Sequence, residues 1–146
     1  VVNCDIYPFC PTAWRQTGVG PEHRKGGMVT LERRGDDLYA NGRKVKLFLA
    51  DGQEKNGVRG YFLRDVLAEK PVLNANVLDY LIQYPELIPE SWRVIKRVCF
   101  WADIYCDPTD DQTVRHLLLD GIKWDWDDHL LIHDFDGDFP AAILEE

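Results

Sequence analysis

Three aspartates near the C-terminus stand at alternate positions, a spacing that could bind a divalent cation. Asp134, Asp136 and Asp138 begin this stretch, and Glu145 is twelfth counting from Asp134, as in a calcium-binding loop. The match is incomplete, because such a loop needs glycine at its sixth position, which is Phe139 here. A solvated acidic turn is therefore the main interpretation, and a weak Ca²⁺ or Mg²⁺ site at the three aspartates is the alternative.

Two histidines, His129 and His133, are four residues apart. On a helix this spacing would place both rings on one face, where they could bind Zn²⁺ or Ni²⁺. We expect an extended segment instead, in which residues four apart stand roughly 13 Å from each other. Ordinary exposed or capping histidines are the main interpretation.

A cysteine thiol is the candidate nucleophile of the chain. Cys99 or Cys106 could form a thiol–imidazole pair with His116 across adjacent strands, which leaves a thiol-dependent enzyme open as an alternative. The spacings of Cys4 from Cys10 and of Cys99 from Cys106 are too wide for a zinc knuckle. Free thiols are the main interpretation, and a disulfide between Cys4 and Cys10 stays open.

The strongest binding candidate is a set of aromatic side chains beside acidic ones. We call Trp101, Tyr105, Trp124 and Trp126 the aromatic platform. If these rings converge, they form a flat surface for a cationic peptide, a cationic small molecule or a sugar, helped by Asp125, Asp127 and Asp128. The alternative is that the rings form the core of a sheet, since large aromatic side chains are mostly buried.

Charge is distributed unevenly along the chain. Residues 98–146 hold 13 acidic side chains, 11 of them aspartate, against Arg115 and Lys123, which gives that segment a net charge of −11. Such a surface repels nucleic acid and attracts cations or basic proteins. Basic residues gather earlier, and an anion or RNA contact is the alternative to a solvated strand face for Arg24, Lys25, Arg33, Arg34, Arg43, Lys44 and Lys46.

The chain has the size and composition of one globular domain. Its 146 residues are 45% hydrophobic and contain no apolar run long enough to span a membrane, so we expect a soluble protein without a membrane partner. Residues 1–27 are rich in glycine and proline and predict an irregular arm, docked through its aromatic residues onto a single domain at 28–146. No motif calls for a cofactor. The compartment stays open, with the cytoplasm slightly favoured.

Alternating and helical patterns predict the elements of this domain. Three strands are expected at 28–33, 37–40 and 44–49, with a type I′ turn at Asn41-Gly42. Helices are expected at 60–69 and, after the N-cap Asn74, up to Pro85, followed by a compact corner at 85–92. Further strands are expected at 98–106, 113–119 and 122–127, with a second type I′ turn at Asp120-Gly121.

These elements predict an α+β fold. Two antiparallel meanders, which could join as one curved sheet or a partial barrel, flank a pair of short helices.

Four motifs in the second half carry a resemblance: NANVLDYL at 74–81, PELIPESW at 85–92, FWADIY at 100–105 and DFPAAIL at 138–144. The pattern resembles a group of short bacterial proteins of uncharacterised function, encoded among accessory genes such as mobile elements or gene cassettes. The resemblance implies that residues 73–144 are one structural unit. It implies no activity and no site residues.

The leading hypothesis is a non-enzymatic binding or inhibitor-type protein whose acidic, aromatic C-terminal sheet contacts a cationic partner protein or peptide. One rival is a small metal-dependent or thiol-dependent enzyme. A second rival is a homo-oligomer that binds a small ligand in a cavity lined by Trp124 and Trp126. The sequence leaves the oligomeric state and the identity of the partner open.

Overall fold

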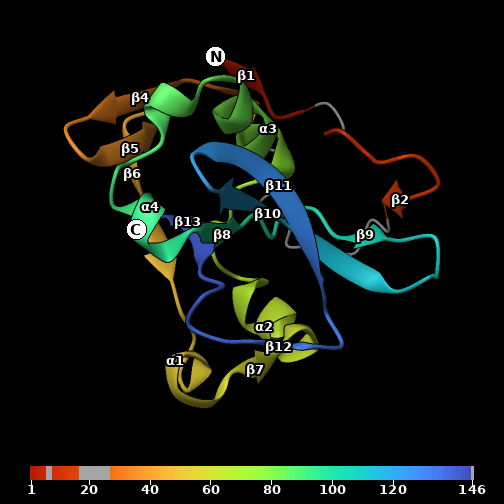
Figure 1. The fold of residues 1–146 in the computed structure, drawn as a ribbon. Helices are drawn as coiled ribbons and strands as arrows, with labels where there is room; N and C mark the ends of the chain where they lie inside the picture. The colour runs from red at the N-terminus through yellow and green to blue at the C-terminus, as the bar shows by residue number, and fades with distance from the viewer. Residues whose placement is uncertain (6–7, 17–26, 146) are drawn as a thin grey trace.

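The computed structural model describes residues 1–5, 8–16 and 27–145 of the chain, which form a mixed α and β structure. A nine-stranded sheet curls into an open half-barrel, with the strand order β2-β9-β10-β8-β13-β6-β5-β4 and with β11 paired to β10 (Figure 1). This architecture confirms the predicted α+β class. None of the helices in the described residues is long and apolar enough to cross a membrane.

The first meander comprises three antiparallel strands, β4 (Leu31–Arg34), β5 (Asp37–Ala40) and β6 (Arg43–Phe48). Asn41 and Gly42, between β5 and β6, have φ of 50° and 80°, which confirms the predicted type I′ turn. The predicted first strand is split at Thr30. Its beginning, β3 (Met28–Val29), pairs with β1 (Val2–Asn3) at the N-terminus.

Both predicted helices are present, as α2 (Gly60–Leu67) and α3 (Ala75–Gln83). Asn74 is the N-cap residue of α3, but its side chain makes no cap hydrogen bond and instead donates to the Cys4 carbonyl at 3.2 Å. The Oδ2 atom of Asp103 accepts the hydrogen bond from Ala75 N at 2.8 Å. A carboxylate from a distant segment therefore caps the helix.

The predicted corner after α3 contains η2 (Pro85–Leu87) and α4 (Trp92–Ile95). Trp92 is buried and packs in the core.

The second meander comprises β8 (Arg97–Cys99), β9 (Tyr105–Cys106), β10 (Gln112–Asp120) and β11 (Lys123–Leu130). The single strand predicted at 98–106 is wrong, because the chain leaves the sheet between β8 and β9. There the Ala102 N–H donates to the Leu73 carbonyl at 3.2 Å, and Asp103 caps α3. Strand pairing is interrupted at this point because Ala102 and Asp103 form hydrogen bonds at the start of α3 instead.

The turn between β10 and β11 differs from the predicted one. Asp120 pairs with Lys123, so Gly121 and Ile122 are the central residues. Gly121 has φ of 66°, whereas Ile122 does not have a positive φ, a combination that fits a type II′ turn.

The C-terminal strand β13 (Ala141–Leu144), which the sequence patterns did not predict, joins the two meanders. It pairs antiparallel with β6 and parallel with β8, where Ala141 is opposite Cys99. The other short elements are β2 (Arg15–Gln16), α1 (Gln53–Asn56), β7 (Val58–Arg59) and β12 (Asp134–Phe135).

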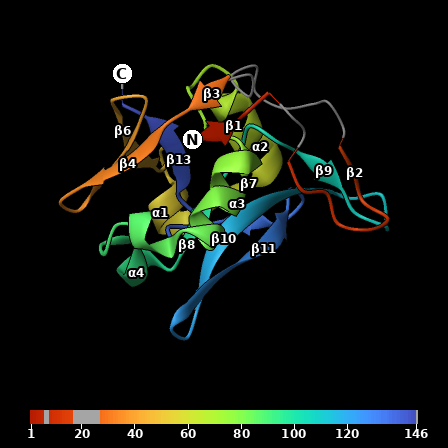
Figure 2. The ribbon, with the colours of Figure 1, turned by 90° about the horizontal axis from the view of Figure 1, so that it is seen from above.

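Two apolar clusters fill the space on either side of the sheet. One lies between α3 and the face that carries Val98, Leu117 and Trp124. The other lies between α2 and the opposite face, which carries Cys99 and Val114. Figure 2, seen from above, shows α3 lying over β8 and β10, with the β10–β11 hairpin extending beyond them. Both faces of the hairpin are therefore covered in part, and its exposed acidic side chains lie near the turn and on β11.

Candidate binding surface on the β10–β11 hairpin

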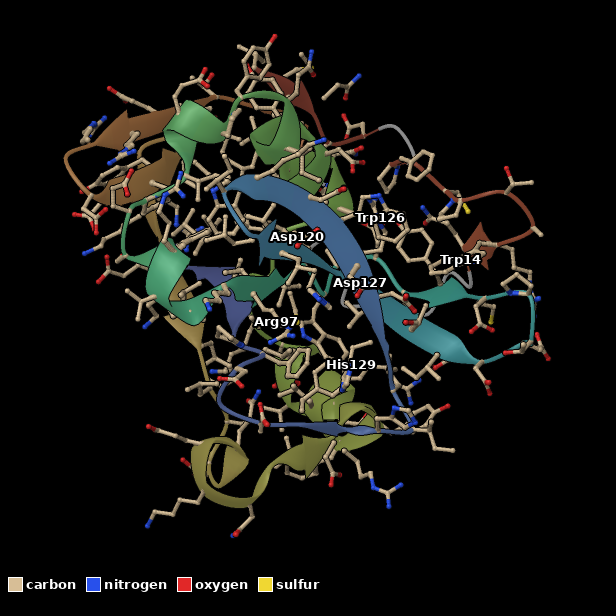
Figure 3. All side chains as sticks on the ribbon, viewed as in Figure 1. Trp14, Arg97, Asp120, Trp126, Asp127 and His129 are labelled. Atoms are coloured by element: carbon tan, nitrogen blue, oxygen red, sulfur yellow. The ribbon has the colours of Figure 1, made fainter. Side chains whose placement is uncertain are left out.

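Strand alternation divides the side chains of β11 between two faces. Asp125, Asp127 and His129 lie on one face, opposite Leu118, His116 and Val114 of β10. We call this the acidic face. Trp124, Trp126 and Asp128 lie on the other face, which packs toward α3. Figure 3 shows Asp127 and His129 near Arg97, whereas Trp126 lies beside Trp14.

The free edge of β11 is protected by its own carboxylates. The backbone N–H groups of Trp126 and Asp128 donate to Asp125 Oδ1 and Asp127 Oδ1, each at 2.8 Å. These two N–H groups point away from β10, at the edge where β11 has no neighbouring strand among the described residues. Charged side chains on an open edge discourage uncontrolled strand pairing.

The hairpin carries more acidic side chains than basic ones. Within the described residues, none of Asp120, Asp125, Asp127 and Asp128 forms an ion pair. Asp128 is half-buried, and burial raises the pKa of its carboxyl although the hydroxyl of Thr113 donates to it at 2.7 Å. The other three are exposed. Lys123 stands opposite Asp120 and Arg115 opposite Asp128 in the strand pairing, but neither pair is within ion-pair distance, so the hairpin presents net negative charge.

The aromatic platform does not form as one surface. Trp101 is fully buried and packs on Phe135, with 5.3 Å between ring centroids, while Trp124 is buried in the cluster under α3. Both rings belong to the core, as the alternative interpretation expected. The physical reason is the break after β8, which turns Trp101 into the interior between the sheet and α2.

The remaining platform residues, Tyr105 and Trp126, surround the buried side chain of Arg115. The guanidinium carbon lies 4.4 Å from the Trp126 ring centroid and 6.0 Å from that of Tyr105. Arg115 Nη2 donates to Asp79 Oδ1 at 2.7 Å, and Nη1 donates to Asp79 Oδ2 at 3.3 Å. Burial lowers the pKa of Arg115, but the hydrogen bond and charge of Asp79 outweigh it, so the net shift is upward.

The arm covers these two rings. Phe9 packs edge-on against Trp126, and Trp14 packs edge-on against both Trp126 and Tyr105, each with 6.0 Å between ring centroids. Sequence patterns did not identify Phe9, Trp14, Asp79 or Arg115 as part of a site. One signal was present for Arg115, an arginine inside the apolar strand that runs from 113 to 119.

One of the two predicted thiol–imidazole pairs lies side by side in adjacent strands, but its thiol is not ionised. Cys99 lies opposite His116, whereas Cys106 pairs with Gln112. Burial raises the pKa of the Cys99 thiol and lowers that of the His116 imidazole to about 4, so both side chains are neutral at pH 7. Neither ring nitrogen of His116 has a hydrogen-bond partner in the described residues. The geometry supplies no thiolate.

The candidate metal ligands are not gathered. In the part of the chain that the structure describes, no three His, Cys, Asp or Glu side chains form a group that could hold a metal ion. Asp134 pairs with Arg59 at 3.3 Å, and Asp136 Oδ1 accepts from Asp138 N at 2.9 Å. These contacts match the solvated acidic turn.

The two histidines are closer than expected. A turn after Leu130 brings the rings of His129 and His133 to a centroid distance of 5.8 Å, so the expected separation of an extended strand is wrong. The His133 N–H donates to the Leu130 carbonyl at 3.1 Å and closes this turn.

The cysteines and the basic residues of the first meander make ordinary structural contacts. All four cysteines are free thiols. Arg34 pairs with Glu32 at 2.9 Å, Lys44 pairs with Asp37 at 3.4 Å, and Arg33 donates to the carbonyls of Glu86 and Ile88. Arg24 and Lys25 lie outside the described residues.

The hairpin region therefore offers two surfaces on opposite faces of β11, the acidic face and the covered pair of rings around Arg115. Comparisons of the chain with protein-family models, with curated proteins and with solved structures gave no match.

Proposed function

We propose that this chain is a non-enzymatic binding protein whose β10–β11 hairpin contacts a cationic protein or peptide. One observation carries the proposal: Asp120, Asp125, Asp127 and Asp128 share one hairpin, and none of them is in an ion pair within the described residues. A cationic partner would supply the missing counter-charges. Because three of these carboxylates are exposed, attraction to such a partner would begin before contact.

The open edge of β11 supports the same function. Alternate residues of β11 direct their backbone groups away from β10, and the carboxylates of Asp125 and Asp127 lie directly over the N–H groups of the following residues. A lysine or arginine side chain could bind the Oδ2 atoms of these carboxylates while Oδ1 keeps its hydrogen bond to the following N–H, so the fold would not change. The surface is therefore suited to charge recognition rather than to strand addition.

The test uses an octalysine peptide as the probe and backbone amide NMR shifts as the readout. We expect the shifts to change mainly along β11, and the affinity to fall steeply as salt is added, because exposed charges are screened. The double variant Asp125→Asn, Asp127→Asn should weaken binding about three- to tenfold, as expected for the loss of two exposed charge contacts. Asparagine keeps the oxygen that accepts from the following N–H, so the edge is preserved.

The matched control removes two exposed acids elsewhere, Asp51 before α1 and Glu69 after α2. Asp51→Asn combined with Glu69→Gln changes the net charge by the same amount and should leave the affinity nearly unchanged. Equal losses in the two double variants, or binding that does not depend on salt, would contradict a role for the hairpin.

A further inference from the structure

Residues 8–16, which we call the docked loop, lie across the covered rings of the hairpin region. The Cys4 N–H donates to the Gly27 carbonyl at 2.8 Å, and β1 pairs with β3, so the chain is held together on both sides of this loop. Figure 1 shows β2 of the loop lying beside β9 at the margin of the sheet. The loop can thus leave the surface and stay attached to the fold.

Phe9 is held by its backbone as well as by its ring. Its N–H donates to Asp79 Oδ2 at 3.4 Å, and its carbonyl accepts from Arg115 Nη1 at 3.4 Å and from Tyr105 Oη at 3.2 Å. The guanidinium of Arg115 lies 5.3 Å from the centroid of the Phe9 ring. These contacts engage the ring and both backbone polar groups of one aromatic residue, so an aromatic residue of another chain could make the same contacts.

Arg15 provides a second point of contact, six residues after Phe9. It lies opposite Cys106 in the pairing of β2 with β9, and its guanidinium forms an ion pair with Asp110. Trp14 fills the space between these two contacts, beside Trp126 (Figure 3). The docked loop is itself a cationic, aromatic segment bound to the acidic half of the protein.

The loop and the surface beneath it differ in how firmly they are held. Phe9 is 54% exposed, and the side chains of Arg15 and Asp110 are 64% and 73% exposed. The side chain of Arg115 is fully buried, and Tyr105 is buried as well. Exposed ion pairs contribute little stability, so the contact between Arg15 and Asp110 adds little to the cost of opening the loop.

We propose that the surface formed by Asp79, Tyr105, Asp110, Arg115 and Trp126 is a receptor for a peptide segment that carries an aromatic residue and, six positions later, an arginine, with a turn between them like the one that the Trp14 N–H and the Pro11 carbonyl close in the docked loop. The docked loop is the built-in occupant of this receptor and competes with the partner. The inference rests on the proposed function, because it names the kind of cationic partner that the acidic half binds.

The test uses a synthetic, fluorescently labelled copy of residues 8–16, in which serine replaces the cysteine. The receptor is the full chain with Phe9→Ala and Trp14→Ala, which removes the competing rings. We expect this variant to bind the peptide at least about tenfold more tightly than the wild-type chain, because an attached competitor acts at a high effective concentration. Equal or absent binding by a folded variant overturns the proposal.

Two matched changes test the individual contacts. A peptide with alanine in place of its phenylalanine should lose most of its affinity. Asp110→Asn in the receptor should weaken binding of the arginine peptide but not of a peptide with glutamine at that position. Asparagine suits this site, since Asp110 has φ of 69° and asparagine tolerates that region. Equal weakening of both peptides overturns the arginine contact.

Hydrogen exchange in the wild-type chain tests the proposal without relying on the variant. The amides of Phe9, Arg15 and Gln16 should exchange at least about tenfold faster than those of β10, through opening of the loop alone. Exchange of all these amides only with global unfolding overturns the proposal. If the octalysine peptide binds at β11 while the loop peptide binds nowhere, this inference fails and the proposed function stands.

Discussion

At the scale of single residues, the most unusual side chain is that of His116. It is 2% exposed, and both of its ring nitrogens lack hydrogen-bond partners in the described residues. Its ring packs edge-on against Phe139, with 5.6 Å between ring centroids, and the titratable side chains around it are those of Asp127, Arg97 and His129. Burial lowers its pKa from 6.5 to about 4. Protonation of a buried imidazole without hydrogen-bond partners is unfavourable, because the charged form loses its solvation.

This pKa links the stability of the protein to pH. The unfolded chain takes up a proton at His116 as the pH falls below 6.5, whereas the folded chain takes it up only near pH 4. Protonation therefore favours unfolding across this interval, and the free energy of unfolding should fall by about 3 kcal/mol between pH 6.5 and 4 from this residue alone. His116→Leu should remove that part of the slope, as measured by denaturant unfolding at a series of pH values.

At pH 7 the same substitution should change stability by less than about 1 kcal/mol, because it removes a polar ring that has no partner. His133→Leu, at an exposed position, is the control and should keep the slope of the wild-type chain. Parallel pH profiles for the wild-type chain and His116→Leu would show that His116 does not carry this effect.

At the scale of elements, the start of α2 is fixed by a close backbone approach. A Cβ atom added at Gly60 would lie 2.6 Å from Leu131 Cα and 2.8 Å from the Leu131 carbonyl oxygen. Gly60 N also donates to the His133 carbonyl at 3.2 Å. Because Gly60 has no side chain, the start of α2 packs directly on the turn that follows β11. This contact positions the C-terminal end of β11.

Gly60→Ala should therefore lower the free energy of unfolding by about 3 kcal/mol, since backbone atoms must move to admit a methyl group. Gly137→Ala is the matched control, because its Cβ would meet only Glu54, at 3.5 Å. That variant should stay within about 0.5 kcal/mol of the wild-type chain. Similar melting temperatures for the two variants would rule out the close approach as the cause.

At the scale of the whole molecule, the net negative charge lowers the stability of the folded state. The chain has a net charge of −8, and the hairpin acids add to it without ion pairs in the described residues. Mutual repulsion among exposed carboxylates weakens the folded state.

Asp125→Asn and Asp127→Asn should each raise the free energy of unfolding by about 0.5 kcal/mol at low ionic strength. The gain should disappear at high salt, where repulsion is screened. Asp36→Asn should have the opposite sign, because Asp36 accepts from Ser91 N at 3.3 Å and lies near Arg33. Thermal unfolding at two salt concentrations measures all three effects, and a loss of stability in the hairpin variants would contradict the repulsion.

Local patterns in the sequence determined much of this protein. The turn at Asn41-Gly42 follows from two residues that tolerate positive φ, and the helices α2 and α3 follow from the spacing of their apolar residues. The separation of Asp125 and Asp127 from Trp124 follows from the two-residue period of a strand. Such features depend on neighbours within a few positions, so they are visible in the sequence.

Only the tertiary structure decided the rest. Asp103 leaves the predicted strand because the start of α3, 28 residues earlier, needs a cap. The strand β13 joins two meanders that are far apart in the sequence, and Phe9 covers an arginine 106 residues away. These contacts join segments that are far apart in the sequence, so no local periodic pattern of residues predicts them. Buried groups find their hydrogen-bond and packing partners in whichever segment the fold brings next to them.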